Sequence, residues 1–375
     1  MKHPMTPFPT SGYFGPEYFC DRVLESRTLL ENIKSGQSTT LISLRRLGKT
    51  ALIHHVHYQL KEEFICIYTD LLSTENMQDM RDNLTSAIIR AVPEESTFGQ
   101  RLWTFVKSLR PVISYDSLSG EPSVSFNTTV QESRKQIESL FDFLETLEKP
   151  VLISIDEFQQ IVSYPEEQTD AWLRTKIQQL KNVVFIFSGS HQHLMNELFT
   201  KTGRPFFRST LLLNLGDIDR EVYKTFIIAK FNSFKIEISD EVAIKILEWT
   251  KGYTYYVQLL CNRIFICAQT EVTEELWKTE ASKLLQEQQY VFYSYRDMLT
   301  KQQWRLIKAL ASEGKTYNPT SKDFVSKYQL GSPSTVLRSL ESLKGMELIF
   351  HQYDDMGKSF YSVYDLLFQR WMELR

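Results

Sequence analysis

The sequence has little cysteine for its 375 residues, and its four cysteines form no pattern of close pairs. Disulfide-stapled secreted domains and zinc sites both depend on closely spaced cysteines or on cysteine and histidine sets. The sequence therefore predicts no disulfide framework and no metal centre of the zinc type. Two of the cysteines lie within apolar runs, and we expect all four to be reduced thiols in the core: Cys20, Cys66, Cys261 and Cys267.

Long hydrophobic runs are also missing. The longest apolar run is about as long as a strand, whereas a membrane-spanning helix needs about 20 apolar residues. The N-terminal stretch MKHPMTPFPTSGYFG lacks the apolar region of a signal peptide. We therefore expect no membrane partner and a cytoplasmic location.

Neither sign of charge is in large excess, since the formal net charge is -3. This balance gives no general attraction to nucleic acid or anionic lipid, so binding to either requires a local patch. What is present is an ordinary globular composition, with 42% hydrophobic and 24% charged residues, which excludes a mostly disordered or fibrous chain. The length exceeds what one hydrophobic core usually holds and predicts two or three domains.

Strand-like apolar runs alternate with helical patterns from residue 24 to about residue 238, which predicts an α/β fold with a parallel five-stranded sheet. The runs are continuous rather than alternating, so we expect strands that are buried on both faces. An inserted β-hairpin is expected near 112–128, after two helices. The five expected strands are 39–44, 64–71, 151–156, 183–190 and 210–215, and the two helices are 76–92 and 97–109.

Helical patterns dominate after Gly216, and Ser239 with Asp240 is the expected cap of one of these helices. The last stretch has three helical patterns, two short strands and a final helix, which is typical of a winged helix-turn-helix. We therefore predict three domains: a core at 1–217 that carries the hairpin, an all-α lid at 218–297 and a winged helix at 298–375.

The strongest local signal is SLRRLGKT, residues 43–50, which follows an expected strand and opens an expected helix. This is the context of a phosphate-binding loop, or Walker A motif, in which successive backbone N–H groups surround the phosphates of ATP. We expect Lys49 to reach the β- and γ-phosphates, Thr50 to bind Mg²⁺, and Gly48 to allow close approach of the backbone. The expected nucleotide-binding residues are Ser43, Leu44, Arg45, Arg46, Leu47, Gly48, Lys49, Thr50 and Ala51.

The loop departs from the usual pattern at its entrance, where Ser43 replaces the first glycine. A Cβ at this place could tighten or misplace the loop around the phosphates. The motif therefore predicts nucleotide binding and leaves the rate of hydrolysis open.

Two carboxylates end an apolar strand in VLISIDEF, which is typical of a Walker B motif. Open α/β sheets present their ligands at the carboxyl ends of the strands. We expect Asp156 to hold Mg²⁺ through water and Glu157 to orient and partly deprotonate the attacking water. A solvated strand end is the alternative.

Polar residues also end the next expected strand, VVFIFSGS. Ser188 or Ser190 could sense the γ-phosphate, because a hydroxyl can bond a phosphate oxygen or the attacking water. Ser190 could instead cap the following helix. Farther along, Arg204 or Arg208 could stabilise charge in the transition state, in this chain or from a neighbouring subunit, and plain surface arginines are the alternative.

Together these segments resemble the archaeal-type ATPase family of the AAA+/STAND superfamily, which is related to origin-recognition initiators. The matching segments, in chain order, are YFCDRVLES, LISLRRLGKTALI, IYTDL, ISIDEFQQI, FIFSGSHQHLMNELF, PFFRSTLLLNL, KGYTYYVQLL and YSVYDLLFQRW. The resemblance implies an AAA+-like core in which Asp21 and Arg22 lie against the adenine and ribose. It also implies that Tyr253 to Tyr256 face the site from the lid. The lid motif departs from the family, because Thr254 stands where proline is expected.

The third helix of the C-terminal module, PSTVLRSLESLK, has a core stripe expected at Val336, Leu337, Leu340 and Leu343. The face expected to be exposed could enter a DNA groove, and its residues are Thr335, Arg338, Ser339 and Ser342. Residues 301–375 hold 11 Lys or Arg against 8 Asp or Glu, a weak excess for a DNA-binding module. Duplex DNA is one expected partner, and a protein-contact module is the alternative.

The main hypothesis is a Mg-dependent ATPase that acts as a nucleotide-driven conformational switch, with ATP or ADP in the site and DNA, a protein or a second copy as partner. A nucleotide-binding module with little or no hydrolysis is the alternative suggested by Ser43 and Thr254. A small-molecule kinase would need a substrate lid with closely spaced arginines, whereas residues 218–297 predict a helical bundle. No guanine-binding NKxD motif supports a GTPase.

Overall fold

The computed structural model describes residues 6–92, 97–109, 111–115, 122–126, 128–354 and 356–375. The described chain folds into two compact units. Within the described residues, the first unit consists of 9–223 with Tyr253–Tyr255, and the second of Thr6–Phe8, Lys224–Gly252 and Tyr256–Arg375. Most of the lid and the winged helix thus share one unit, and the division at 218–297 and 298–375 stays a prediction.

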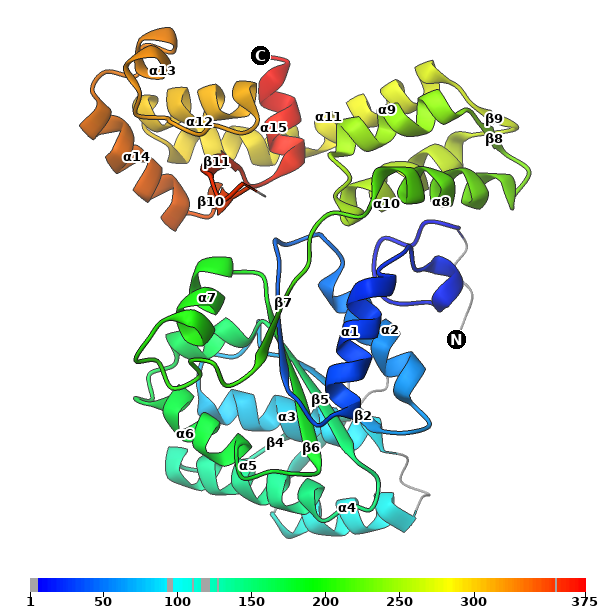
Figure 1. Cartoon of the computed structure of the whole chain (residues 1–375), viewed down its shortest axis with the longest axis vertical. Coiled ribbons are helices and arrows are strands. Elements are labelled where there is room, and N and C mark those ends of the chain that lie inside the picture. Colours follow the sequence, from blue (N-terminus) through cyan, green and yellow to red (C-terminus); the bar gives the residue numbers. More distant parts are fainter. Residues whose placement is uncertain (1–5, 93–96, 110, 116–121, 127, 355) are drawn as a thin grey trace. The chain divides into compact units, whose positions relative to one another are not determined.

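The first unit is built on a five-stranded parallel sheet with strand order β2-β5-β6-β1-β7 (Figure 1). The predicted fold class is confirmed, and each strand lies where the sequence predicted it. The strands are β1 (Thr39–Ile42), β2 (Ile65–Asp70), β5 (Val151–Asp156), β6 (Val183–Gly189) and β7 (Leu211–Asn214). Because β1 lies beside β6, which pairs with β5, the carboxyl ends of these three strands meet at one edge of the sheet.

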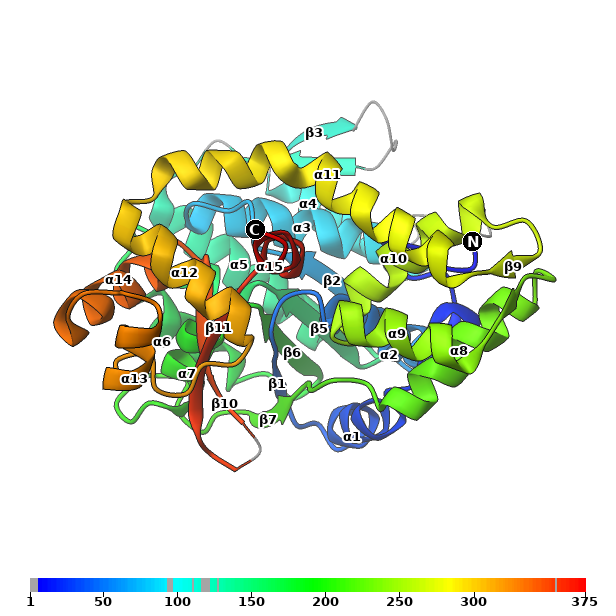
Figure 2. The same cartoon turned by 90° about the horizontal axis from the view of Figure 1, so that it is seen from above.

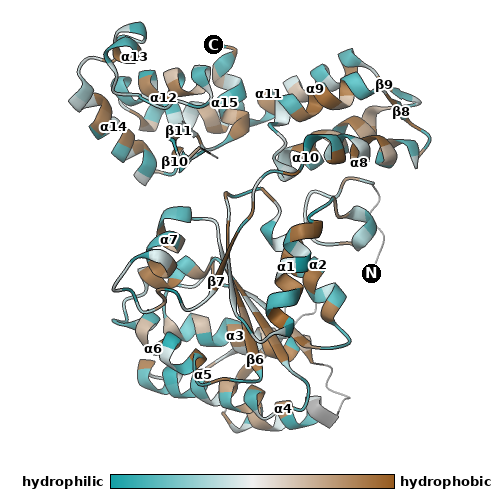
Figure 3. Cartoon of the chain, viewed as in Figure 1, coloured by the Kyte–Doolittle hydropathy of each residue, from teal (hydrophilic) through white to brown (hydrophobic). Residues whose placement is uncertain are grey.

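Helices cover both faces of this sheet, and strand residues alternate between the two resulting cores. Leu152 of β5 packs in the cluster that contains α1 and α2, whereas its neighbours Val151 and Ile153 pack in the other cluster. Figure 3 shows the strands of the sheet mostly in the colour of hydrophobic residues, whereas the helices around them carry both hydrophilic and hydrophobic residues. The helices are α1 (Val23–Lys34) and α2 (Lys49–Leu60) on one face, and α3 (Met77–Ala91), α4 (Thr97–Ser108), α5 (Val130–Glu145), α6 (Thr169–Ile177) and α7 (Gln192–Thr200) on the other.

The expected burial of the strands and of the cysteines is wrong in part. The edge strand β7 has one neighbour, and its Leu211 and Leu212 are 44% and 48% exposed, so it is not buried on both faces. The four cysteines are free thiols, as expected. However, Cys267 is exposed at the end of its helix and Cys66 is half-buried, so only the other two lie in a core.

The expected hairpin consists of β3 (Val112–Tyr115) and β4 (Pro122–Ser125), which pair in antiparallel fashion. Its predicted turn lies outside the described residues. Ser86 of α3 accepts a hydrogen bond from the N–H of Val124, and Val124 itself is buried in the larger core. The hairpin is therefore attached to the helical layer on that face.

The predicted lid helices lie mostly in the second unit, with one small departure from an all-α lid, because β8 (Glu237–Ile238) and β9 (Glu271–Val272) pair in parallel. Ser239 caps α9 by accepting from the N–H of Val242, as predicted. Figure 2 shows the long helix α11 running from the lid helices to the winged helix. The lid helices are α8 (Arg220–Asn232), α9 (Asp240–Thr250), α10 (Thr254–Cys267) and α11 (Glu274–Met298).

The C-terminal module has three helices, a two-stranded antiparallel wing and a final helix, which confirms the predicted winged helix. Its elements are α12 (Lys301–Glu313), α13 (Lys322–Lys327), α14 (Pro333–Gly345), β10 (Ile349–Tyr353), β11 (Ser359–Val363) and α15 (Leu366–Glu373).

The predicted stripe on α14 is wrong at two positions. Leu337 is 51% exposed, whereas Ser339 is buried and its hydroxyl donates to the carbonyl of Thr335. A spacing of three and four residues from Val336 leads to Ser339 and Leu340, while Leu337 lies on another face of the helix. Arg338 is exposed, as expected, whereas Thr335 and Ser342 are half-buried. Across the residues that the structure describes, no helix has both the length and the apolar character needed to span a bilayer.

Candidate nucleotide-binding site

The predicted phosphate loop leads from the end of β1 into α2. Gly48 precedes the helix with φ 91°, and Arg46 also has a left-handed backbone, with φ 72°. Alternation of left-handed residues turns successive N–H groups toward one side and forms an anion-binding concavity. A Cβ added at Gly48 would lie 3.6 Å from Thr254 Cγ2, which is an ordinary contact, so the positive φ is what requires glycine inside this chain.

The structure accommodates the serine at the loop entrance. Ser43 is fully buried, lies outside the left-handed region, and its hydroxyl donates to the carbonyl of Leu44 at 2.8 Å. The loop backbone therefore needs no glycine at this place, and the side chain at the entrance is compatible with the loop conformation.

Asp156, at the end of β5, is the centre of a hydrogen-bond network at the carboxyl edge of the sheet. The side chain is 3% exposed. The four donors are Thr50 Oγ1 at 2.8 Å and Tyr68 OH at 3.0 Å to Oδ2, and Ser188 Oγ at 2.5 Å and the N–H of Glu157 at 3.0 Å to Oδ1. The network fixes the orientation of this carboxylate relative to the start of α2.

Two of these contacts bear on the sequence predictions. Ser188 is fully buried and its hydroxyl donates to Asp156, and a role in sensing phosphate stays a prediction. Tyr68 was not predicted, although it lies in an expected strand. Because β2 pairs with β5, with Tyr68 opposite Ser154, the topology of the sheet brings the phenol to Asp156.

Glu157 is held on one of its two carboxylate oxygens. Its Oε2 accepts from Ser190 Oγ at 2.8 Å, from the Ser190 N–H at 3.3 Å and from Gln159 Nε2 at 2.5 Å. Arg45 of the phosphate loop donates in turn to Ser190 Oγ at 2.9 Å. The alternative role of Ser190 as a helix cap is wrong, since His191 precedes α7 and no side chain caps that helix.

Lys49 is almost fully buried at the first position of α2. Burial lowers the pKa of its ammonium group, and Arg45 adds to that effect, while Asp156 and Glu157 oppose it. An anion beside Lys49 would favour its charged form. The chemistry of the buried lysine thus fits a phosphate ligand.

His54, which lies beside Tyr68, was likewise not predicted from the sequence. The ring of His54 lies 4.5 Å from that of Tyr68. Burial lowers the pKa of His54, and the charge of Asp156 partly opposes this shift. His54 therefore belongs to the surroundings of the acidic strand end.

Of the two N-terminal residues assigned by resemblance, Arg22 contacts the phosphate loop. Arg22 is buried, with φ 65°, and its guanidinium donates to the carbonyl of Leu47 at 3.2 Å and pairs with Glu25 at 2.9 Å. Asp21 also has a left-handed backbone, with φ 57°. Contact of Asp21 and Arg22 with adenine and ribose stays a prediction.

The lid residues expected to face the site divide between the two units. Thr254 and Tyr255 contact the phosphate loop, where the Thr254 hydroxyl donates to the carbonyl of Leu47 at 3.2 Å and the Tyr255 N–H donates to that of Arg46 at 3.1 Å. Burial, with a contribution from Asp217, raises the pKa of Tyr253 to about 12. Tyr256 belongs to the second unit.

The two candidate arginine fingers, Arg204 and Arg208, contact residues outside the phosphate loop. Arg204 pairs with Glu197 and lies 3.9 Å from Asp170. Arg208 is exposed, has φ 54°, and its guanidinium lies 5.2 Å from the ring of Phe207. An action of either arginine on phosphate stays a prediction.

The residues present fit a magnesium ion that is shared with phosphates. Among the described side chains, no group of three or more His, Cys, Asp or Glu could hold a metal ion without other ligands. Mg²⁺ is bound by one or two protein oxygens together with water and substrate phosphates. Thr50 Oγ1 and Asp156 Oδ2, which are 2.8 Å apart, provide such an oxygen pair beside the loop.

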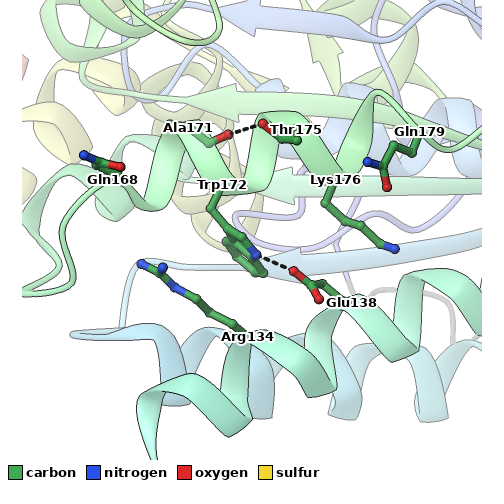
Figure 4. A pocket seen from close by; sticks show the side chains of 8 residues that line it. All are labelled: Arg134, Glu138, Gln168, Ala171, Trp172, Thr175, Lys176 and Gln179. Carbon is green, nitrogen blue, oxygen red and sulfur yellow. Dashed lines mark hydrogen bonds between the residues drawn. The ribbon is translucent and has the colours of Figure 1, made fainter.

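A separate pocket of about 520 Å³ lies between α5 and α6, and no predicted site residue lines it (Figure 4). Trp172 points from α6 toward α5, where its Nε1 donates to Glu138 Oε1 at 2.6 Å. The guanidinium of Arg134 lies 5.6 Å from the Trp172 ring and donates to the carbonyl of Glu167 at 2.9 Å. These groups join the two helices, and we assign the pocket no ligand.

Solved structures with a similar fold include three archaeal proteins. The Walker-type ATPase paby2304 of Pyrococcus abyssi is 17% identical, with a TM-score of 0.67, and the match covers 98% of this chain and 99% of that one. The Aeropyrum pernix ORC1 protein, in complex with DNA, is 13% identical, with a TM-score of 0.55 and coverage of 99% and 96%. The Aeropyrum pernix ORC2 protein, as ADPNP-ADP complexes, is 12% identical, with a TM-score of 0.56 and coverage of 98% and 97%.

Family models match two parts of the sequence. Residues 290–374 match a probable winged helix domain, and residues 19–260 match an ATPase domain predominantly from Archaea. No curated protein sequence matches the chain. Since the second match runs from before the phosphate loop into the lid and covers well over half of the sequence, the chain belongs to this family of ATPase domains found predominantly in Archaea.

Proposed function

We propose that the chain binds Mg-ATP at the phosphate loop and hydrolyses it, and that the change from ATP to ADP acts as a conformational switch. The observation that carries this proposal is the convergence of Lys49 and Thr50 with Asp156 and Glu157 at the carboxyl edge of the sheet. These four residues come from segments about 106 positions apart, yet Thr50 and Asp156 are in direct contact.

Each residue has a chemical role in this proposal. Lys49 balances charge on the β- and γ-phosphates, and Thr50 and Asp156 hold Mg²⁺. When bound, the ion would neutralise charge on the phosphate oxygens. Glu157 orients the attacking water and accepts its proton, and we assign this role to Oε1, since the three hydrogen bonds described above fall on Oε2.

The winged helix is proposed to pass the nucleotide-dependent change to duplex DNA. The support is the exposed position of Arg338 on α14, together with the solved complex of the Aeropyrum pernix ORC1 protein with DNA. A protein partner or a second copy on the same module is the other outcome.

A second candidate function is a nucleotide-binding module with little hydrolysis. It is favoured by the engagement of Glu157, because Ser190, Gln159 and indirectly Arg45 hold its carboxylate in the described conformation. Hydrogen bonds that hold this carboxylate would slow its activation of water, and therefore hydrolysis.

Steady-state phosphate release by the full chain separates these functions. We expect Mg²⁺-dependent release from ATP, little from GTP, and no transfer to added small acceptors. Tight ATP binding without release would favour the second candidate. Transfer to an acceptor would favour a kinase, and failure to bind any nucleotide would reject the assignment of the site.

A further inference from the structure

Two carbonyls of the phosphate loop, those of Arg46 and Leu47, accept hydrogen bonds from other parts of the first unit. A trans peptide is planar, so its C=O and the N–H that follows point in opposite directions. Fixing the carbonyl of Arg46 therefore aims the N–H of Leu47, and fixing the carbonyl of Leu47 aims the N–H of Gly48. These are the two N–H groups that directly precede Lys49.

Three donors hold these two carbonyls. The N–H of Tyr255 donates to Arg46 O at 3.1 Å. The carbonyl of Leu47 accepts both from Thr254 Oγ1 and from the Arg22 guanidinium, each at 3.2 Å. The loop is thus held on the side opposite to its N–H groups, by one segment from before the loop in sequence and another 207 residues after it.

Side-chain packing supports the same arrangement. The guanidinium of Arg46 lies 5.1 Å from the centre of the Tyr255 ring, a distance suited to a cation–π contact. The Thr254 side chain lies against Gly48, where a Cβ would be 3.6 to 3.8 Å from its atoms. Thr254 and Tyr255, which we term the strap, therefore contact the loop through backbone, hydroxyl and ring.

We propose that Thr254 is a positioning residue of the nucleotide site, whose hydroxyl keeps the Gly48 N–H directed at the phosphates before nucleotide arrives. This inference rests on the proposed function and adds a residue to it. Proline, which the family motif has at this place, lacks a hydroxyl and cannot make this hydrogen bond. In this chain the threonine therefore anchors the loop by a hydrogen bond.

Three substitutions of Thr254 in the full chain test the proposal. Thr254→Val keeps the shape and removes the donor, Thr254→Ser keeps the donor, and Thr254→Pro introduces the family residue. Thr254 is the first residue of α10, where proline is tolerated because its N–H has no partner within the helix, so all three variants are expected to fold. Thermal unfolding without ligand checks this.

Calorimetric titration with Mg-ADP and with Mg-pyrophosphate gives the readout. We expect the valine and proline variants to bind both ligands about three- to tenfold more weakly, as loss of one neutral hydrogen bond implies, and the serine variant to stay within about twofold of the wild type. The two ligands should weaken by the same factor, because the strap contacts the phosphate loop.

The outcomes separate the inference from the function on which it rests. If the wild type binds Mg-ADP and the valine and proline variants bind it equally well, Thr254 has no positioning role. Weakened ADP binding with unchanged pyrophosphate binding, or failure of serine to rescue, would also overturn the inference. If the wild type itself binds neither ligand, the proposed function fails first.

Discussion

Thr50 Oγ1 lies 2.8 Å from Asp156 Oδ2, which brings the first turn of α2 into contact with the end of β5. Both oxygens are ligands that Mg²⁺ accepts. The contact places the start of α2 beside the acidic strand end, in the region where we propose that phosphate, metal and water bind. Predictions for the site follow from this geometry.

Replacement of Lys49 should separate binding from folding. Lys49→Met is expected to lower Mg-ATP affinity at least tenfold, because charge-assisted hydrogen bonds to phosphate are lost. The free energy of unfolding should be unchanged or higher, since burial already lowers the pKa of the ammonium group and so penalises its charge. Calorimetry and chemical denaturation measure the two quantities.

Lys61→Met is the matched control for this variant. Lys61 follows the other end of α2 and is exposed, so its removal should leave nucleotide affinity unchanged. Equal affinities of the Lys49 variant and the wild type, in a folded protein, would contradict the assignment of the phosphate site.

Glu157→Gln should retain binding and lose turnover. Three donors meet Oε2, so the amide oxygen should occupy that position and the NH₂ group should face the place that we assign to water. An NH₂ group cannot accept a proton, and phosphate release should fall about 100-fold or more.

The control for the glutamate lies beyond the opposite end of the same strand. Glu148 is exposed and precedes β5, so Glu148→Gln should leave phosphate release unchanged. Full hydrolysis by the Glu157 variant would move the catalytic role to another residue.

Lys251, which directly follows α9, should make the free energy of unfolding depend on pH. Burial, together with Arg370 and Lys315 and against Glu373, lowers its pKa to about 8. Below pH 8 the folded state carries a buried charge. Between about pH 8 and 10.5 the folded state loses this proton before the unfolded state does, so the contribution of Lys251 to stability rises with pH.

The variant Lys251→Met isolates this contribution. The stability of the variant relative to the wild type should fall by about 2 kcal/mol between pH 7.5 and 10.5, after allowance for partial exposure of the lysine. Urea unfolding at several pH values measures the difference. A constant difference across this range would show that Lys251 keeps an ordinary pKa in the folded chain.

If the winged helix binds duplex DNA, Arg338 on α14 should contribute more to the affinity than Lys358 in the wing. Arg338→Ala should lower the affinity of the full chain for duplex DNA about tenfold at low salt, if α14 enters a groove. Lys358 lies 4.5 Å from the ring of Tyr317 at the wing, and Lys358→Ala should cost about twofold. Fluorescence anisotropy at several salt concentrations compares them.

The DNA titration also has a decisive negative outcome. If the ATP-loaded wild type binds no duplex at low salt, the DNA proposal is rejected and the module is a protein-contact surface. Equal losses for both variants would favour general contact with the DNA backbone over entry into a groove.

The sequence by itself determined the elements that depend on neighbouring residues. Continuous apolar runs marked the five strands, and SLRRLGKT between a strand and a helix marked the phosphate loop, because these patterns follow from local geometry. The helix cap at Ser239 and the order of elements in the winged helix could be predicted for the same reason.

Only the tertiary structure decided which distant groups meet. Strand order brought Tyr68 to Asp156, made β7 an exposed edge, and turned Ser188 and Ser190 toward the two carboxylates. The contact of Thr254 with the Leu47 carbonyl spans 207 residues, and periodicity within a segment carries no information about such a pairing. It depends on how the first unit folds around its sheet, which no single segment specifies.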